Sequence, residues 1–170
     1  MLADRHGNAS MELACGLAEE IVRNFGEVRL SVFGTSMVPS ILPGDLVLIH
    51  RAGLDDVSRG DAVLFLQNRR LFVHRIVDRK VMTVAGSIEE PCLITRGDRL
   101  LHNDPPVSSR ELLGRVVSIE RENRTVELLP LGSNRLIIGL LQSSDRVTSL
   151  YLRLAGFWRT LFFRRAKCQV

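Results

Sequence analysis

The fold is decided by the stretch Phe33-Gly34-Thr35-Ser36-Met37-Val38-Pro39-Ser40-Ile41-Leu42-Pro43-Gly44-Asp45-Leu46-Val47-Leu48-Ile49. Small and polar residues come first, two prolines and a Gly-Asp pair follow, and an apolar run closes the stretch. Proline and glycine at these positions are typical of turns, and a proline pushes the residue before it into an extended conformation. The stretch therefore predicts a tight loop that carries Ser36 into a β-strand.

The hydroxyl of Ser36 has two interpretations. Serines in turns most often hydrogen-bond to the nearby backbone, so a structural role is the commoner one. A serine held in a fixed loop is also a candidate nucleophile, provided that a base reaches its proton. The choice between them depends on the rest of the chain.

Four more short motifs follow in chain order, and with the Ser36 stretch they form a set that resembles type I signal peptidases and the related self-cleaving SOS proteins and repressors, the S24/S26 peptidase superfamily. The resemblance extends from Val28 to about Arg121, and it depends on the order of the motifs because each alone is weak. The four motifs are Arg59-Gly60-Asp61-Ala62-Val63-Leu64-Phe65, Val73-His74-Arg75-Ile76-Val77, Thr95-Arg96-Gly97-Asp98 followed by Asn103-Asp104, and Leu113-Gly114-Arg115-Val116.

The resemblance implies a catalytic role for three residues. Ser36 would be the nucleophile, His74 the general base and Asp104 the residue that orients the base. Bacterial signal peptidases and the self-cleaving proteins have a lysine base, whereas His74 resembles the endoplasmic-reticulum and archaeal signal peptidases. Asp98 remains a competing candidate for orienting His74.

The resemblance also implies how the site treats its substrate. The backbone N–H of Ser36 would stabilise the oxyanion, and Thr35 is a candidate second donor because Gly34 stands where bacterial relatives have a helping serine. Substrate would bind as an extended strand, with small residues preferred at the cut. The remaining histidines match no motif and are interpreted as surface residues: His6, His50 and His102.

Short apolar runs separated by turns predict a mainly β domain. Many strands at this spacing favour a folded-over antiparallel sheet or partial barrel, as in signal peptidases. Asn68-Arg69 and Glu122-Asn123 are predicted hairpin turns, and 97–112 is a predicted loop. The predicted strands are 28–33, 45–51, 62–67, 70–78, 81–85, 91–95, 113–121 and 124–129.

Helices are predicted at both ends of this domain. Leu13, Leu17, Ile21 and Val22 recur at helical spacing and Gly26 provides a stop, which predicts an amphipathic helix over 11–25 that packs on the domain, after a frayed start. The predicted organisation is an N-terminal helical segment (1–27), a catalytic β domain (28–130) and a C-terminal helical segment (131–170).

The C-terminal segment predicts a basic amphipathic helix over 145–165. Apolar residues from Val147 to Phe162 follow a 3.6-residue period, and no acidic residue comes after Asp145. Such a helix suits an anionic membrane surface, a partner protein or its own sheet, and these alternatives stay open. Nucleic acid is not favoured, because the rest of the chain has no interleaved basic surface.

Composition limits the remaining classes. The chain of 170 residues is 45% hydrophobic with a net charge of +4, which is typical of a globular protein. Cys15, Cys92 and Cys168 lack the spacing of a metal site, so no metal or cofactor is expected. No signal peptide or membrane span is apparent, which predicts a cytoplasmic protein, with peripheral attachment to a membrane as the alternative.

The sequence thus predicts a serine endopeptidase that cleaves a precursor peptide or protein. Two alternatives remain. One is a self-cleaving regulator, because Cys15-Gly16 resembles the bond that such proteins cut. The other is a catalytically silent scaffold that binds an extended peptide.

Overall fold

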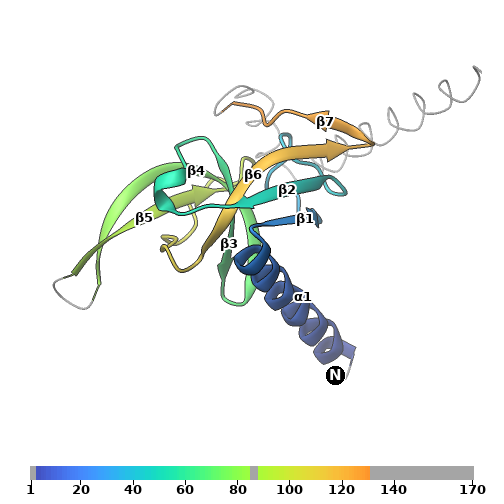
Figure 1. Ribbon diagram of the computed structural model, residues 1–170, viewed down its shortest axis with the longest axis horizontal. Helices are drawn as coiled ribbons and strands as arrows, with labels where there is room; N and C mark the ends of the chain where they lie inside the picture. The colour runs from blue at the N-terminus through green and yellow to red at the C-terminus, as the bar shows by residue number, and fades with distance from the viewer. Residues whose placement is uncertain (1–2, 85–87, 131–170) are drawn as a thin grey trace, which may run out of the picture. The chain divides into compact units, whose positions relative to one another are not determined.

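The computed structural model describes residues 3–84 and 88–130, which contain one helix and an antiparallel sheet (Figure 1). These residues belong to the first of two units into which the chain divides, Met1–Ser133. The helix predicted over 145–165 lies outside the described residues. Helix α1 (Ala3–Phe25) leads into β1 (Glu27–Ser31) and β2 (Leu46–Arg51), and a short 3₁₀ turn η1 (Leu54–Asp56) precedes β3 (Ala62–Gln67). The remaining strands are β4 (Arg70–Val84), β5 (Ile88–Arg96), β6 (Leu112–Arg121) and β7 (Arg124–Val126).

The seven strands of this part form one sheet in the order β1-β2-β6-β3-β4-β5, with β7 paired to β6. Every pair is antiparallel. The predicted mainly antiparallel β fold is confirmed. The prediction of a break between strands 70–78 and 81–85 was wrong, because residues 70–84 form the single strand β4.

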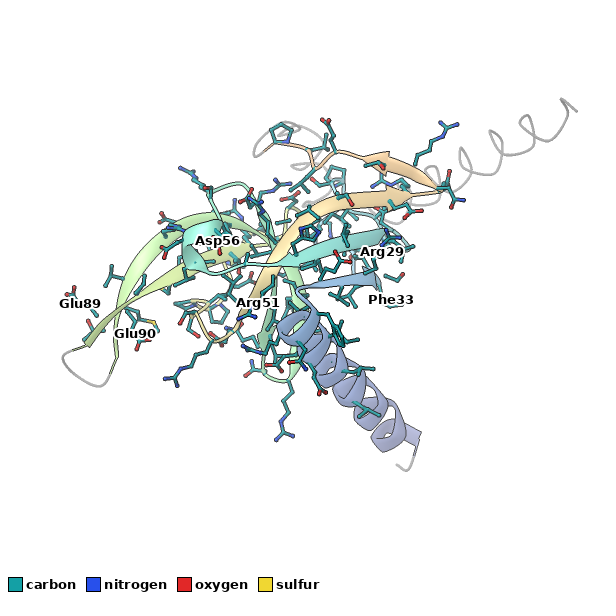
Figure 2. All side chains as sticks on the ribbon, in the orientation of Figure 1. Arg29, Phe33, Arg51, Asp56, Glu89 and Glu90 are labelled. Atoms are coloured by element: carbon teal, nitrogen blue, oxygen red, sulfur yellow. The ribbon has the colours of Figure 1, made fainter. Side chains whose placement is uncertain are left out.

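The polar run Asp78-Arg79-Lys80 caused that error. Its residues are exposed, and beyond Arg75 β4 pairs with β5 alone, where the buried side chains opposite this run come from β5. The two strands extend as an arm beyond the other strands, with Glu89 and Glu90 at its far end (Figure 2). Polar residues can continue a strand where no core demands an apolar one.

Two hairpin turns fix the register of their strands. Asn68 and Arg69 have φ of 51° and 59°, and Glu122 and Asn123 have φ of 54° and 60°. Two consecutive residues with positive φ are typical of the turn type that matches the twist of paired strands. Both predicted hairpin turns are confirmed.

The sheet buries apolar side chains on both faces, because alternate residues of a strand point to opposite sides. On one side, Ala62 and Leu64 pack with residues from β1, β2, β6 and α1. On the other, Val63 and Phe65 pack with Ile76 and with residues from β5 and its neighbouring loop. Strand β3 is thus covered twice, which explains its continuous apolar run.

Helix α1 differs from its prediction at its start and in its buried face. It begins at Ala3 rather than residue 11, and it ends where Gly26 takes a φ of 81° and donates its N–H to the Val22 carbonyl at 3.0 Å. Cys15, Ala18 and Val22 are buried, whereas Leu13 and Leu17 are 75% and 57% exposed. A helix turns about 100° per residue, so the two leucines lie opposite the packed face. Their predicted packing was wrong because small side chains bring the helix against the sheet.

Candidate active site

Ser36 lies in the loop between β1 and β2, and this loop is fixed by buried contacts. Met37 and Ile41 enter the core that α1 covers. The fully buried carboxylate of Asp45 accepts the backbone N–H of Leu42 at 2.8 Å. It also pairs with Arg121 through two hydrogen bonds of 2.9 and 2.7 Å. A paired, hydrogen-bonded carboxylate of this kind holds its surroundings rigidly, so Ser36 has a defined position.

His74 lies in β4, on the face that Val63 and Phe65 also occupy. The centre of its ring lies 6.0 Å from the ring of Phe65 and 5.8 Å from that of Phe72. Strand β5 ends at Arg96, opposite the residue that follows His74. The neighbouring loops can therefore reach His74 where the pairing with β5 stops.

Three side chains converge at this point. The Oγ atom of Ser36 lies 2.9 Å from Nε2 of His74, and Nδ1 of His74 lies 2.7 Å from Oδ2 of Asp104. The His74 side chain is 6% exposed and that of Asp104 is 18% exposed, so water has little access to their hydrogen bond. A nucleophile, a base and an orienting group are the parts that acyl transfer by serine requires. The structure therefore brings together all three residues that the sequence selected.

Asp104 is itself held by Thr95. The Thr95 hydroxyl donates to Oδ2 of Asp104 at 2.7 Å, and the Asp104 N–H donates to the Thr95 carbonyl at 2.8 Å. Thr95 is fully buried at the end of β5. Sequence reasoning missed its role because Thr95 and Asp104 are nine residues apart in the chain, and their contact arises only when the intervening loop folds back.

Asp98 pairs with Arg75 and not with His74, the residue that it was a candidate to orient. Its carboxylate forms two hydrogen bonds with Arg75, of 2.7 and 2.8 Å, and it also accepts the Ser40 hydroxyl. The side chains of Arg75 and Asp98 are 2% and 6% exposed. Because Arg75 follows His74 on the strand, it points to the opposite face. Asp104 contacts the imidazole, and Asp98 instead joins the Ser36 loop to β4.

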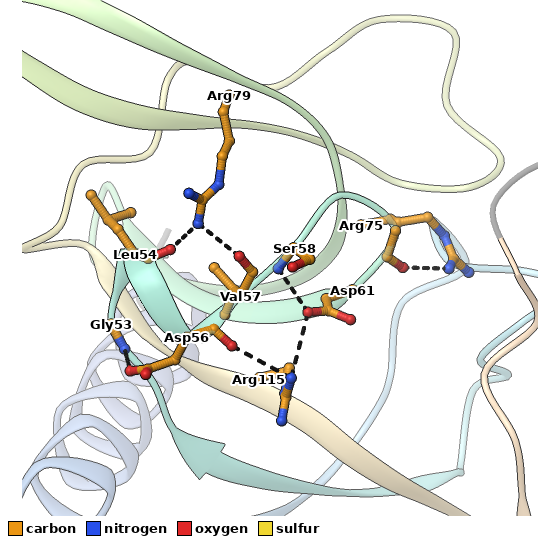
Figure 3. Close-up of polar contacts among 10 residues, drawn as sticks. Gly53, Leu54, Asp56, Val57, Ser58, Asp61, Arg75, Arg79 and Arg115 are labelled. Atoms are coloured by element: carbon orange, nitrogen blue, oxygen red, sulfur yellow. Dashed lines mark hydrogen bonds and ion pairs between the residues drawn. The ribbon is translucent and has the colours of Figure 1, made fainter.

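Arg75 also ties in the connection between β2 and β3. Its Nη1 donates to the Gly60 carbonyl at 2.8 Å (Figure 3). Arg79 of β4 donates to the Leu54 and Val57 carbonyls of the same connection. Within the connection, Asp61 accepts the Ser58 N–H at 2.9 Å. These contacts hold the Gly60-Asp61 turn beneath the guanidinium of Arg75. The second motif of the sequence therefore supports the strand that carries His74.

The turn after β5 contacts Ser36 directly. The Arg99 N–H donates to the Ser36 carbonyl at 2.9 Å, and the Arg99 guanidinium donates to the Thr35 hydroxyl at 3.2 Å. The N–H of Leu100 donates to the carbonyl of Gly97 at 2.9 Å, which closes the turn. Gly97 belongs to one of the sequence motifs, but no role at the nucleophile was predicted for it. Nothing in the spacing indicated its contact with the nucleophile.

The other candidates lie apart from this centre. His50 lies 3.4 Å from Glu27, with both side chains more than half exposed, and His102 is exposed in the loop before Asp104. Cys15 and Gly16 lie inside α1. Within the described ranges, no group of three or more His, Cys, Asp or Glu side chains is placed to hold a metal ion.

Comparison with protein families agrees with this arrangement. Residues 2–84, slightly less than half of the chain, match the family described as Peptidase S24-like. This part of the chain is therefore similar to S24-like peptidases. No curated protein matches the sequence. The S24-like match includes Ser36 and His74 and stops before Thr95 and Asp104. It therefore gives no information on Thr95 and Asp104, whose contacts with the site come from the geometry.

The structure also bears on whether a helix of the chain could span a membrane. In the part of the chain that the structure describes, no helix is long and apolar enough to cross a bilayer.

Proposed function

We propose that this protein is a serine endopeptidase in which Ser36 is the nucleophile, His74 the general base and Asp104 the residue that orients the base. The observation that carries the proposal is the pair of short contacts of His74, 2.9 Å to the serine hydroxyl and 2.7 Å to the carboxylate. A base within this distance can take the proton of its nucleophile. The S24-like match supports the same chemistry.

The first half of the reaction forms an acyl-enzyme. The Nδ1–H group of His74 donates a hydrogen bond to the Asp104 carboxylate, which leaves Nε2 free to accept the Ser36 hydroxyl proton. The Ser36 oxygen then attacks the carbonyl carbon of the scissile peptide bond, and the carbonyl oxygen becomes an oxyanion. The backbone N–H of Ser36 is the proposed donor to that oxyanion. When the intermediate collapses, His74 returns the proton to the departing amine.

The second half releases the acyl group. Water replaces the departed amine, His74 takes a proton from it, and the resulting hydroxide attacks the ester carbon. The bond to Ser36 breaks and His74 gives the proton back to the serine oxygen. Asp104 stays ionised throughout and stabilises the imidazolium each time it forms. Thr95 assists by holding the carboxylate in place.

The proposed substrate is another protein or peptide bound in extended form. The histidine base resembles that of the endoplasmic-reticulum and archaeal signal peptidases, and this favours cleavage of a precursor next to small residues. An extended substrate would add a strand beside the site and gain main-chain hydrogen bonds. This assignment to a branch of the superfamily is part of the proposal.

Self-cleavage is the second candidate, since the family match alone fits either activity. One observation weighs against it. The Cys15-Gly16 bond lies within α1, where Cys15 is buried. A peptidase of this kind binds its substrate extended, so α1 would have to unwind before that bond entered the site. The geometry therefore favours cleavage of another chain.

Covalent labelling tests the proposal without knowledge of the substrate. A fluorophosphonate probe should react with the full-length protein at Ser36, and mass spectrometry of the digested protein should locate the adduct there. Ser36→Ala should remove the adduct, and His74→Ala should greatly slow its formation. Ser58→Ala is a matched control because Ser58 is exposed in the connection before β3.

The same experiment separates the enzyme from a silent scaffold. A scaffold would keep the fold and leave the probe unreacted. Incubation of the protein with a peptide library should then yield no cleaved product. Absence of both reactions in a folded sample would exclude the proposed peptidase.

A further inference from the structure

Residue 97 faces the nucleophile more closely than a side chain would allow. A Cβ atom placed on Gly97 would lie 2.8 Å from the Ser36 carbonyl oxygen and 2.9 Å from Ser36 Cβ. Real Cβ atoms essentially never come within 3.0 Å of a neighbour. Neither atom moves when the Ser36 side chain rotates about its Cα–Cβ bond, so such rotation cannot relieve the clash. Any side chain at position 97 must move either Ser36 or the turn itself.

The turn is the less movable of the two. Asp98 follows Gly97, and its carboxylate is held in the buried ion pair with Arg75. Withdrawal of the turn would pull these charges apart in a place that water does not reach, which is costly. The displacement caused by a side chain would therefore fall on Ser36.

We propose that Gly97 is a positioning residue for Ser36: the absence of a side chain lets the turn of residues 97–100 lie against the nucleophile and hold its hydroxyl within hydrogen-bond distance of His74. This inference rests on the proposed function, because positioning has a consequence for rate only if Ser36 reacts. Gly97 itself touches no reacting atom. It acts through the carbonyl and Cβ of Ser36.

Gly34 provides a matched control. A Cβ atom on Gly34 would lie 4.0 Å from Ser36 Oγ, which is ordinary van der Waals contact. Gly34→Ala and Gly97→Ala therefore add the same methyl group near the same serine, and only the second creates a clash. Comparison of the two variants isolates the close approach from the general effect of losing a glycine.

The test uses the full-length protein, a fluorophosphonate probe and thermal unfolding followed by circular dichroism. Gly97→Ala should fold and label Ser36 about 100-fold more slowly, the size of loss that a small misplacement of a reacting group can cause. Gly34→Ala should label at close to the wild-type rate. Labelling of Gly97→Ala at the wild-type rate would overturn the inference. So would its failure to fold, since the glycine would then serve the fold rather than the nucleophile.

A double variant separates Ser36 from the other neighbour of residue 97. The added Cβ would also lie 3.1 Å from Leu100 Cδ1. Gly97→Ala with Leu100→Ala removes that contact and leaves both contacts with Ser36. Slow labelling should persist in the double variant. Recovery of the wild-type rate would attribute the defect to Leu100 and contradict the inference.

A spectroscopic measurement keeps this inference distinct from the proposed function. In protein labelled with ¹⁵N-histidine, the His74 Nε2 resonance should shift when Ser36→Ala removes its partner, and Gly97→Ala should cause the same shift. This readout needs no catalysis. An unreactive wild-type protein with these shifts would refute the peptidase and retain the positioning role. Unchanged His74 signals in Gly97→Ala would refute the positioning role itself.

Discussion

Asp104 affects the reaction through the imidazole, and its contacts allow a sharp test. Its Oδ2 accepts from both His74 Nδ1 and the Thr95 hydroxyl at 2.7 Å. An acceptor at Nδ1 selects the tautomer in which Nε2 is free to receive the Ser36 proton. A change of charge at this carboxylate should therefore alter the rate without altering the shape of the site.

We expect Asp104→Asn to lower kcat by about 10⁴-fold with KM little changed, because an amide that donates to Nδ1 favours the wrong tautomer. Probe labelling or peptide hydrolysis measures the loss. Asp78→Asn is the control, since Asp78 is exposed on the arm and its Oδ1 accepts the backbone N–H of Arg79. A fully active Asp104→Asn would remove Asp104 from the mechanism.

Acid should inhibit the enzyme through His74. A protonated imidazole cannot take the proton of Ser36, so acid that protonates the ring should lower kcat/KM. His74→Lys should not restore activity, because the ring lies beside Phe65 and Phe72 and a flexible ammonium needs different surroundings. Rates across the pH range, with circular dichroism at each pH, provide the measurement. A flat profile in folded protein would argue against a histidine base.

At the scale of elements, the buried pair of Arg75 and Asp98 joins β4 to two loops. Asp98→Asn would leave the Arg75 guanidinium, 2% exposed, without its counter-charge. We expect the free energy of unfolding to fall by about 3 to 5 kcal/mol, the usual cost of breaking a buried pair. Equilibrium unfolding in urea measures it.

Glu19→Gln is the matched control for that prediction. It removes the same charge from the Arg23–Glu19 pair on α1, whose side chains are 47% and 29% exposed. Such surface pairs contribute about 0.5 kcal/mol or less. Equal losses in the two variants would mean that the pair of Arg75 and Asp98 contributes no more than a surface contact.

The elements also explain what the sequence could predict. Most of the strands and both hairpin turns follow from local chemistry, namely apolar runs and, in each turn, an asparagine that tolerates positive φ. The buried face of α1 was predicted only in part: Ile21 and Val22 pack on the core as predicted, whereas Leu13 and Leu17 are apolar yet lie away from the sheet. Only the packing partner reveals that difference. The choice between Asp98 and Asp104 was likewise open, since chain distance does not indicate which carboxylate reaches the imidazole.

At the scale of the whole molecule, the basic segment 145–165 predicts attachment to a surface. If its apolar and basic residues meet an anionic membrane, each basic residue near the surface should contribute about 1 kcal/mol. Salt should weaken the attachment, since charges are screened within about 10 Å at 0.1 M. The full chain should then sediment with anionic vesicles at low salt, and a 1–144 truncation should not.

Neutral vesicles are the control for that experiment. A truncation that sediments as well as the full chain would show that the attachment does not need the C-terminal segment. A full chain that ignores anionic vesicles at low salt would exclude the membrane surface as its partner. A partner protein, or the segment's own sheet, would then become the better hypothesis.

The order of His74 and Arg75 on one strand has a consequence for the length of a distant surface turn. Neighbouring residues face opposite sides of a sheet, so a slip of β4 by one position would exchange them and offer a guanidinium to Ser36. The two residues Asn68 and Arg69 set that register from the far end of the hairpin. One residue inserted there would leave every catalytic side chain in the sequence and still deprive the serine of its base. The chemistry of this protein therefore depends on the length of the turn at Asn68 and Arg69, which lies at the other end of the hairpin from the catalytic residues.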